Sequence, residues 1–333
     1  MLLRTKLGAL LGAVVALCGV TAVSDASAAE ISIGTLAPKH SPWGKVFRVW
    51  KEAVEKKTDG KLVLKFFFNG QQGDEAAMVG KIRSGQLAGA AITSVGLGKI
   101  YQPMLALQMP GLFDTWEGLD KARDDIKDKL AEGAKGEGFL IAGWGDVGLA
   151  HTFTKGVEIR VPTDLRGTKP YRWRDDIIAS TIYDEIKEVN GVPLGVPELL
   201  PALDQGTVNV FSVPALAAEQ LQWASRADHV SENVIAVGIG ALVFSQKAID
   251  ELDADVREVL ISTGRKAGKM LTDRIRAEDA EAFGRIKSNL SLVTLTADEI
   301  GQWSELFKKV RARLAQGTFP AALVSRLEQL AGK

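Results

Sequence analysis

The segment ISIGTLAPKHSPWGKVFRVWKEAVEKKTDGKLVLKFFFNGQQGDEAAMVGKIRSGQLAGAAIT, residues 31–93, decides the fold of this chain. Apolar runs of strand length alternate in it with two stretches of helical periodicity, and the turn residues Asp59-Gly60 and Asn69-Gly70 follow the first helix and the second strand. This order predicts a βαβαβ unit, in which helices cover a parallel sheet. The predicted elements are a strand at Ile31–Leu36, a helix that opens at Ser41-Pro42 with serine as N-cap, a strand at Lys61–Phe68, a helix from Asp74 to Arg83 and a strand at Ala88–Thr93.

A second series of strands and helices is predicted further along the chain. A helix at about Trp116–Ala134 leads into an apolar strand at Gly138–Trp144, and the extended segment after Gly145 predicts a crossover between two lobes. The second series comprises strands near Thr168–Trp173, Val192–Leu194 and Val208–Ser212 and helices at Asp175–Val189, Glu198–Gln205 and Pro214–Ala224. From Asp253 the chain predicts one long amphipathic helix to about Leu290 and two shorter ones. We therefore expect an α/β fold of two lobes, with two parallel-rich sheets flanked by helices, hinge crossovers and a helical C-terminal tail.

The predicted boundaries divide the chain into an export signal and two lobes. Residues 29–152 and 240–284 are assigned to lobe I, and residues 153–239 and 285–333 to lobe II. Residues 1–28 have the pattern of a signal peptide: Arg4 and Lys6, an uncharged apolar run, and the small residues Ala26-Ser27-Ala28. The apolar run of about 14 residues is shorter than a membrane span, so we expect cleavage near Ala28.

Cysteine content and charge exclude several classes of protein. The single cysteine, Cys18, lies inside the predicted signal peptide, so we expect neither disulfides nor thiolate chemistry in the mature chain. A lipid-modified Cys18 is the less favoured alternative, because Leu17 is large where lipoprotein signals have a small residue. The 41 basic and 41 acidic residues give a net charge of zero, which argues against nucleic-acid binding.

No cofactor is predicted from the glycine pattern. Gly143, Gly145 and Gly148 have the G-x-G-x-x-G spacing after an apolar strand, but the following LAHTFTKG is a poor helix and cannot present a helix N-terminus to a pyrophosphate. These glycines are better explained by a chain that crosses a cleft.

Neither a metal site nor a catalytic residue is predicted. The histidines His40, His151 and His229 lack metal-ligand spacing, and no nucleophile elbow or Walker-type motif is present in the sequence. The acidic pair Asp175-Asp176 and the run Glu251–Asp255 lie at predicted helix starts, where carboxylates favour the helix dipole. We therefore expect a binding protein and not an enzyme.

Aromatic residues indicate a ligand cleft. Several of them fall at strand ends or helix starts, which in an open α/β sheet lie at the carboxyl edge where ligands bind. Any single tryptophan is more often part of the core. As a set, these side chains predict a cleft between the lobes: Trp43, Trp144, Tyr171, Trp173, Phe211 and Trp223.

The sequence resembles the solute-binding subunits of tripartite ATP-independent periplasmic (TRAP) transporters, the DctP family. The resemblance covers nearly all of the chain after the signal peptide, and it rests on the order and spacing of six segments. They are IGTLAPKHSPWG from Ile33, TDGKLVLKFFFNGQQGDE from Thr58, RSGQLAGAAITSVG from Arg83, MPGLFD from Met109, PTDLRGTKPYRW from Pro162 and VPELLPALDQGTV from Val196. It implies a periplasmic-binding-protein fold, closure on a small organic ligand in the periplasm, and delivery to small and large membrane subunits.

Two positions depart from the family pattern. Family members usually carry an arginine that binds an organic-acid carboxylate, and the ungapped register from Asp164-Leu165-Arg166-Gly167 places Tyr171 there. A slip of one residue would place Arg172 there instead. Downstream, Val213 stands where the family's D-G-x-E-N-P run has asparagine.

This pattern predicts an apolar or aromatic ligand. In lobe II we expect Tyr171 and Trp173 to stack on or hydrogen-bond the ligand and Phe211 and Val213 to form an apolar wall, with Arg172 and Ser212 in the same set. In lobe I, loop position alone suggests Trp43, Gln71, Ser94 and Trp144. The alternatives are a monocarboxylate receptor that uses Arg172 or Arg174 and, less favoured, an exported enzyme on the same scaffold.

Overall fold

The computed structural model describes residues 28–333, so Cys18 and nearly all of the predicted signal peptide lie outside the described residues. The strands are β1 Ala29–Thr35, β2 Leu62–Phe67, β3 Gly89–Thr93, β4 Phe139–Thr154, β5 Tyr171–Trp173, β6 Val192–Leu194, β7 Val210–Pro214, β8 His229–Ser231, β9 Ala236–Ser245 and β10 Ser291–Val293. The helices are α1 Pro42–Lys57, α2 Glu75–Arg83, α3 Ser94–Ile100, α4 Trp116–Gly136, α5 Ile177–Ile186, α6 Val196–Asp204, α7 Ala215–Gln220, α8 Gln246–Asp250, α9 Ala254–Lys287, α10 Ala297–Leu314 and α11 Ala321–Ala331. Short 3-10 helices are η1 Gln102–Gln108, η2 Pro162–Leu165 and η3 Ala224–Arg226.

The predicted βαβαβ unit is confirmed. Strand β1 pairs in parallel with both β2 and β3. Helix α1 begins as predicted, because the Ser41 hydroxyl accepts a hydrogen bond from the Gly44 amide at 3.3 Å and Pro42 occupies the first helical position. Asp74 caps α2 in the same way, through the Glu75 amide. The local patterns of capping and periodicity were sufficient to place these elements.

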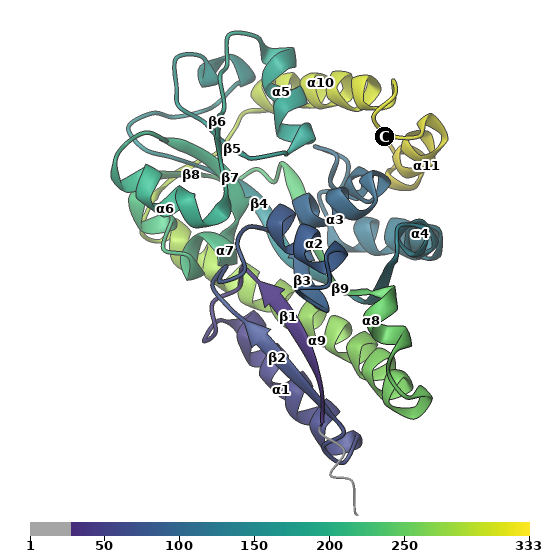
Figure 1. The fold of residues 1–333 in the computed structure, drawn as a ribbon. Helices are drawn as coiled ribbons and strands as arrows, with labels where there is room; N and C mark the ends of the chain where they lie inside the picture. The colour runs from purple at the N-terminus through teal and green to yellow at the C-terminus, as the bar shows by residue number, and fades with distance from the viewer. Residues whose placement is uncertain (1–27) are drawn as a thin grey trace, which may run out of the picture.

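The two-lobed α/β architecture is confirmed, but the predicted division into two parallel-rich sheets is wrong. Eight strands form one mixed sheet with the order β10-β8-β4-β9-β3-β1-β2, in which β7 also pairs with β4, and β5 and β6 form a separate parallel pair. The segment predicted as a strand to Trp144 and then a connector is one 16-residue strand, β4, which runs antiparallel to β9, β7 and β8. Long strands shared by both lobes therefore join what would otherwise be two sheets (Figure 1).

Helix α9 packs closely on β4 and extends along the molecule (Figure 1). Glycines make this approach possible. A Cβ atom on Gly268 would lie 2.5 Å from the Trp144 carbonyl oxygen, and one on Gly143 would lie 2.6 Å from the Gly264 carbonyl oxygen. The glycines of the GWGDVG segment thus serve the packing of a helix on a strand.

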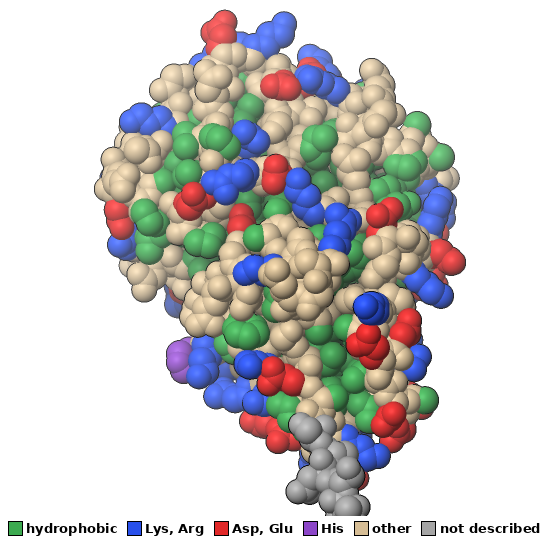
Figure 2. Space-filling model, in the orientation of Figure 1, with side chains coloured by type: hydrophobic (Ala, Val, Ile, Leu, Met, Phe, Trp, Pro, Cys, Tyr) green, Lys and Arg blue, Asp and Glu red, His purple; other side chains and the backbone are tan. Residues whose placement is uncertain are grey.

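The C-terminal helices contact both ends of the fold. Helix α10 packs against α5, whereas α11 packs against α4 and η1. The predicted lobe boundaries stay a prediction, and α11 is placed beside elements that the sequence assigned to lobe I. No helix within residues 28–333 is both long enough and apolar enough to cross a membrane. On the face shown in Figure 2, basic and acidic side chains are interspersed.

Candidate functional site

A cavity of about 320 Å³ lies between the two lobes. Its walls come from the ends of β1 and β3, the middle of β4 and β9, strands β5 and β7, and the helices α5 and α10. Most of the lining side chains are aliphatic or aromatic. The cavity therefore lies where an α/β sheet ordinarily binds ligands, at the carboxyl ends of several strands.

Six of the residues predicted for the site line this cavity: Trp43, Ser94, Tyr171, Trp173, Ser212 and Val213. The hydroxyl of Ser212 lies 3.0 Å from the Thr152 hydroxyl, which belongs to the neighbouring strand β4 and also lines the cavity. Contact of these residues with a ligand stays a prediction.

The other four predicted residues do not line the cavity. Phe211 is a core residue that is 1% exposed and stacks on Phe153 with ring centroids 5.1 Å apart. Trp144 packs among the core side chains behind β4, and Gln71 is exposed in the loop after β2. Strand alternation sends Arg172 to the opposite side of β5 from its two neighbours, and its Nη1 donates to the Ser180 hydroxyl at 3.2 Å.

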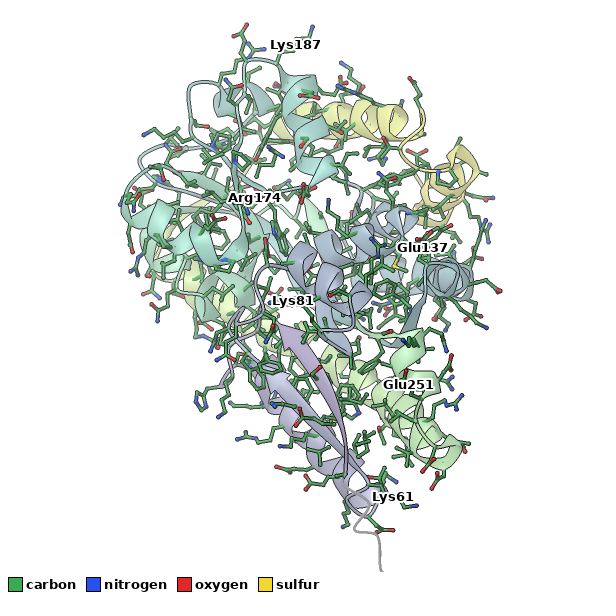
Figure 3. All side chains as sticks on the ribbon, viewed as in Figure 1. Lys61, Lys81, Glu137, Arg174, Lys187 and Glu251 are labelled. Atoms are coloured by element: carbon green, nitrogen blue, oxygen red, sulfur yellow. The ribbon has the colours of Figure 1, made fainter. Side chains whose placement is uncertain are left out.

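Arg174, the other candidate anchor for a carboxylate, also lies outside the cavity wall. It follows β5 and is labelled in Figure 3. Its Nη2 pairs with Glu198 Oε2 at 2.6 Å, and both side chains are about half exposed. Among the cavity-lining residues of the described chain there is no lysine, arginine or histidine.

Tyr171 lines the cavity, and its hydroxyl makes no hydrogen bond within the described residues. The residue is 7% exposed, and within residues 28–333 its hydroxyl has no hydrogen-bond partner. Tyr183, which also lines the cavity, donates its own hydroxyl to the Tyr171 carbonyl oxygen at 2.7 Å. Burial raises the pKa of Tyr171 well above its ordinary value, and the carboxylates of Asp74, Asp176 and Glu75 add to the shift. The hydroxyl therefore stays protonated, and its hydrogen-bonding capacity is unused within the described residues.

Four acidic residues line the cavity, Glu75, Asp146, Asp175 and Asp176, and none of them was predicted as a site residue. Glu75 is 1% exposed and accepts hydrogen bonds from the Thr93 amide, the Thr93 hydroxyl and the Gly96 amide at 2.8–2.9 Å. Burial raises its pKa to about 7. Asp176 is half-buried and caps α5 through the amides of Ile178 and Ala179, and burial raises its pKa also. The sequence identified the acidic pair at Asp175-Asp176 as a helix start, which is confirmed, but it carried no signal that the same carboxyl faces a cavity.

Two polar contacts connect the lobes beside the cavity. The Trp173 indole donates from Nε1 to Asp74 Oδ2 at 2.7 Å, which joins β5 to the start of α2. Lys99 of α3 pairs with Asp175 at 3.3 Å near the start of α5. These two contacts therefore join the lobes beside the cavity.

Comparison with known proteins identifies the family. The sequence model of the bacterial extracellular solute-binding protein family 7, DctP, matches residues 33–317. A solute-binding protein of Verminephrobacter eiseniae is 25% identical over 264 residues, which is 78% of this chain and 76% of the relative. The 2,3-diketo-L-gulonate-binding periplasmic protein YiaO of Escherichia coli is 20% identical over 248 residues, 74% of this chain and 75% of the relative.

The solved structures agree in fold. The sugar acid binding protein DctPAm of Advenella mimigardefordensis, in complex with galactonate, has a TM-score of 0.85 and 19% identity over 92% of this chain and 98% of that protein. These relatives are solute-binding proteins, which agrees with the expectation that this chain is not an enzyme. The chain belongs to the DctP family of solute-binding proteins.

Proposed function

We propose that this chain is the periplasmic receptor of a TRAP transporter, that it captures a small apolar or aromatic molecule, and that it delivers this ligand to small and large membrane subunits. The observation that supports the ligand class is the wall of the cavity. Tyr171 stands there, and the walls contain no basic side chain within the described residues.

Electrostatics disfavour an organic acid in this cavity. A carboxylate taken from water into a largely apolar environment costs several kcal/mol unless a guanidinium or a set of donors pairs with it. Here the ligand would instead face the carboxyl groups of Glu75 and Asp176. The galactonate bound by the structural relative therefore does not indicate the ligand of this chain.

The cavity suits a compact ligand that is enclosed by both lobes. Its volume of about 320 Å³ is at the lower end of the range for ligand pockets. The Trp173–Asp74 and Lys99–Asp175 contacts would form on closure and break on release, because each joins one lobe to the other. A closed receptor of this kind presents a defined surface to membrane subunits.

Three measurements test the proposal. The protein is purified from its export compartment under mild conditions, its N-terminus is sequenced, and any bound molecule is identified by mass spectrometry. Binding of that molecule is then measured for Tyr171→Ala and for Arg172→Ala as the matched variant on the same strand. We expect an aromatic or lipophilic ligand, its loss in Tyr171→Ala and its retention in Arg172→Ala.

The opposite result supports the monocarboxylate alternative. Recovery of a small carboxylate, with binding abolished by Arg172→Ala or Arg174→Ala and retained in Tyr171→Ala, would reject the proposed ligand class. The membrane partners are tested separately, by uptake of the identified ligand into vesicles that contain the cognate small and large subunits. Uptake that does not depend on added receptor would reject the transport role.

A further inference from the structure

We infer that the ligand of this cavity carries a protonated amine, which binds at the Tyr171 hydroxyl beside Glu75 and Asp176 while its apolar body packs on the aromatic wall. This inference rests on the proposed function, because the aromatic wall must hold the rest of the molecule. It names the polar group of that ligand. The argument uses the hydrogen-bond capacity of the three side chains, the charge balance around them and the nature of the surrounding rings.

Each of the three side chains has an acceptor oxygen that no donor of the described residues fills. Within residues 28–333, the hydrogen bonds of Asp176 end on Oδ1, so its Oδ2 has no donor. Glu75 Oε2 accepts one hydrogen bond, from the Gly96 amide, and a carboxylate oxygen can accept two. The buried Tyr171 hydroxyl is the third unfilled group. A primary ammonium has three N–H donors, so it can donate to both carboxyl groups and to the Tyr171 oxygen, whereas a carboxylate could use only the Tyr171 O–H and would face the two carboxyl groups.

The other acidic side chains of the cavity are already neutralised. Asp146 pairs with Arg123 at 2.5 Å and with Arg276 at 2.7 Å. Asp175 pairs with Lys99 at 3.3 Å. These ion pairs leave no uncompensated charge for a ligand.

The negative charges of Glu75 and Asp176 are compensated less completely by neighbouring cations. Glu75 accepts only from neutral donors, and no cation contributes to its pKa shift. Asp176 feels the field of Arg172, whose Nη1 donates instead to the Ser180 hydroxyl. Asp74, at the start of α2, also acts on the Tyr171 hydroxyl and adds negative potential. A cation in the cavity would therefore supply the charge that these carboxyl groups lack.

Aromatic rings complete the surroundings expected for an organic cation. The electron-rich faces of tryptophan, tyrosine and phenylalanine attract ammonium groups and also pack on apolar ligand bodies. Those that line the cavity are Trp43, Phe47, Tyr171, Trp173, Tyr183, Trp223, Trp303 and Phe307. Carboxyl groups beside aromatic rings, with no basic residue among the lining side chains, form a site for an aromatic or alkyl amine.

Three probes of matched shape test the charge preference. The full chain is freed of co-purified ligand by denaturation, dialysis and refolding, and binding of 2-phenylethylamine, 2-phenylethanol and 3-phenylpropionate is measured by calorimetry at pH 7.5. We expect the amine to bind at least about tenfold more tightly than the alcohol, because charge-assisted hydrogen bonds are stronger than neutral ones. The carboxylate should bind most weakly.

Each outcome separates the inference from the proposed function. An amine advantage of less than tenfold, or no binding of the amine, overturns the inference. Tight binding of the alcohol in that case leaves the proposed aromatic ligand class intact. If the carboxylate binds most tightly and Arg172→Ala abolishes this binding, both the inference and the proposed ligand class fail.

Isosteric variants locate the ammonium site. Asp176→Asn preserves a residue that can cap α5 but removes the charge, so amine affinity should fall about tenfold while alcohol affinity stays the same. Asp253→Asn, at the exposed start of α9, is the matched control and should change neither. Tyr171→Phe should weaken both probes, because both use the hydroxyl. Equal losses of amine and alcohol in Asp176→Asn would overturn the assignment of the ammonium to this carboxyl.

Discussion

The buried histidine of β4 makes the stability of this protein depend on pH in a way that one substitution can isolate. His151 is 4% exposed, stacks on Phe283 of α9 with ring centroids 3.9 Å apart, and lies 3.1 Å from the Ser231 carbonyl oxygen through Nδ1. Burial lowers its pKa from 6.5 to about 4. The folded protein therefore keeps this imidazole neutral at a pH where the unfolded chain protonates it.

The size of the effect follows from these two pKa values. The folded state binds fewer protons at His151 than the unfolded chain does between pH 6.5 and pH 4. The contribution of His151 to stability is therefore present in full above pH 6.5 and falls as the pH decreases through this window. At pH 5 the loss amounts to about 2 kcal/mol, and at pH 7.5 it is close to zero. In His151→Phe the ring can still stack on Phe283, the hydrogen bond to Ser231 is lost at every pH, and the pH-dependent loss disappears.

Urea unfolding followed by tryptophan fluorescence measures this difference. We expect the destabilisation caused by His151→Phe to shrink by about 2 kcal/mol between pH 7.5 and pH 5. The exposed His40 provides the control, because His40→Gln should leave the pH dependence of the wild type unchanged. A destabilisation that is the same at both pH values would refute the argument that His151 is held neutral by burial.

Three further substitutions test other parts of the structure. Asp146→Asn should destabilise the protein by about 1–3 kcal/mol in urea unfolding, because it removes the buried carboxylate that Arg123 and Arg276 share while both guanidinium groups keep Asp120; an unchanged free energy of unfolding would contradict this. Gly148→Ala should lower the midpoint of thermal unfolding by several degrees, because φ at this residue is +137° and a Cβ atom there would collide with the Asp279 carboxylate. An unchanged midpoint would contradict this expectation. For Glu75, whose pKa of about 7 lies above that of the unfolded chain, the contribution to stability falls as the pH rises from 4.5 to 7, opposite in sign to that of His151. The wild type should therefore lose stability relative to Glu75→Gln over this range, and a difference between the two proteins that is constant with pH would assign the titration to another group.

Local patterns determined most of the secondary structure and the family. The βαβαβ unit was predicted correctly from patterns among residues that are close in the chain. These patterns are the serine and proline at the start of α1, the aspartate before α2 and the alternation of strand and helix. The family likewise followed from the order of short segments along the chain. Such features depend on neighbours within a few residues, so the sequence alone determined them.

The tertiary structure decided which side chains face the cavity and how the sheet is joined. Strand alternation alone shows that Tyr171 and Arg172 point to opposite sides, but only the packing around β5 decides that the tyrosine faces the cavity. The cavity position of Glu75 depends on how α2 lies against β3 and α3, and the single mixed sheet depends on pairing of β4 with β9, about 100 residues later. These arrangements are set by contacts between distant parts of the chain, and a pattern of neighbouring residues does not specify them.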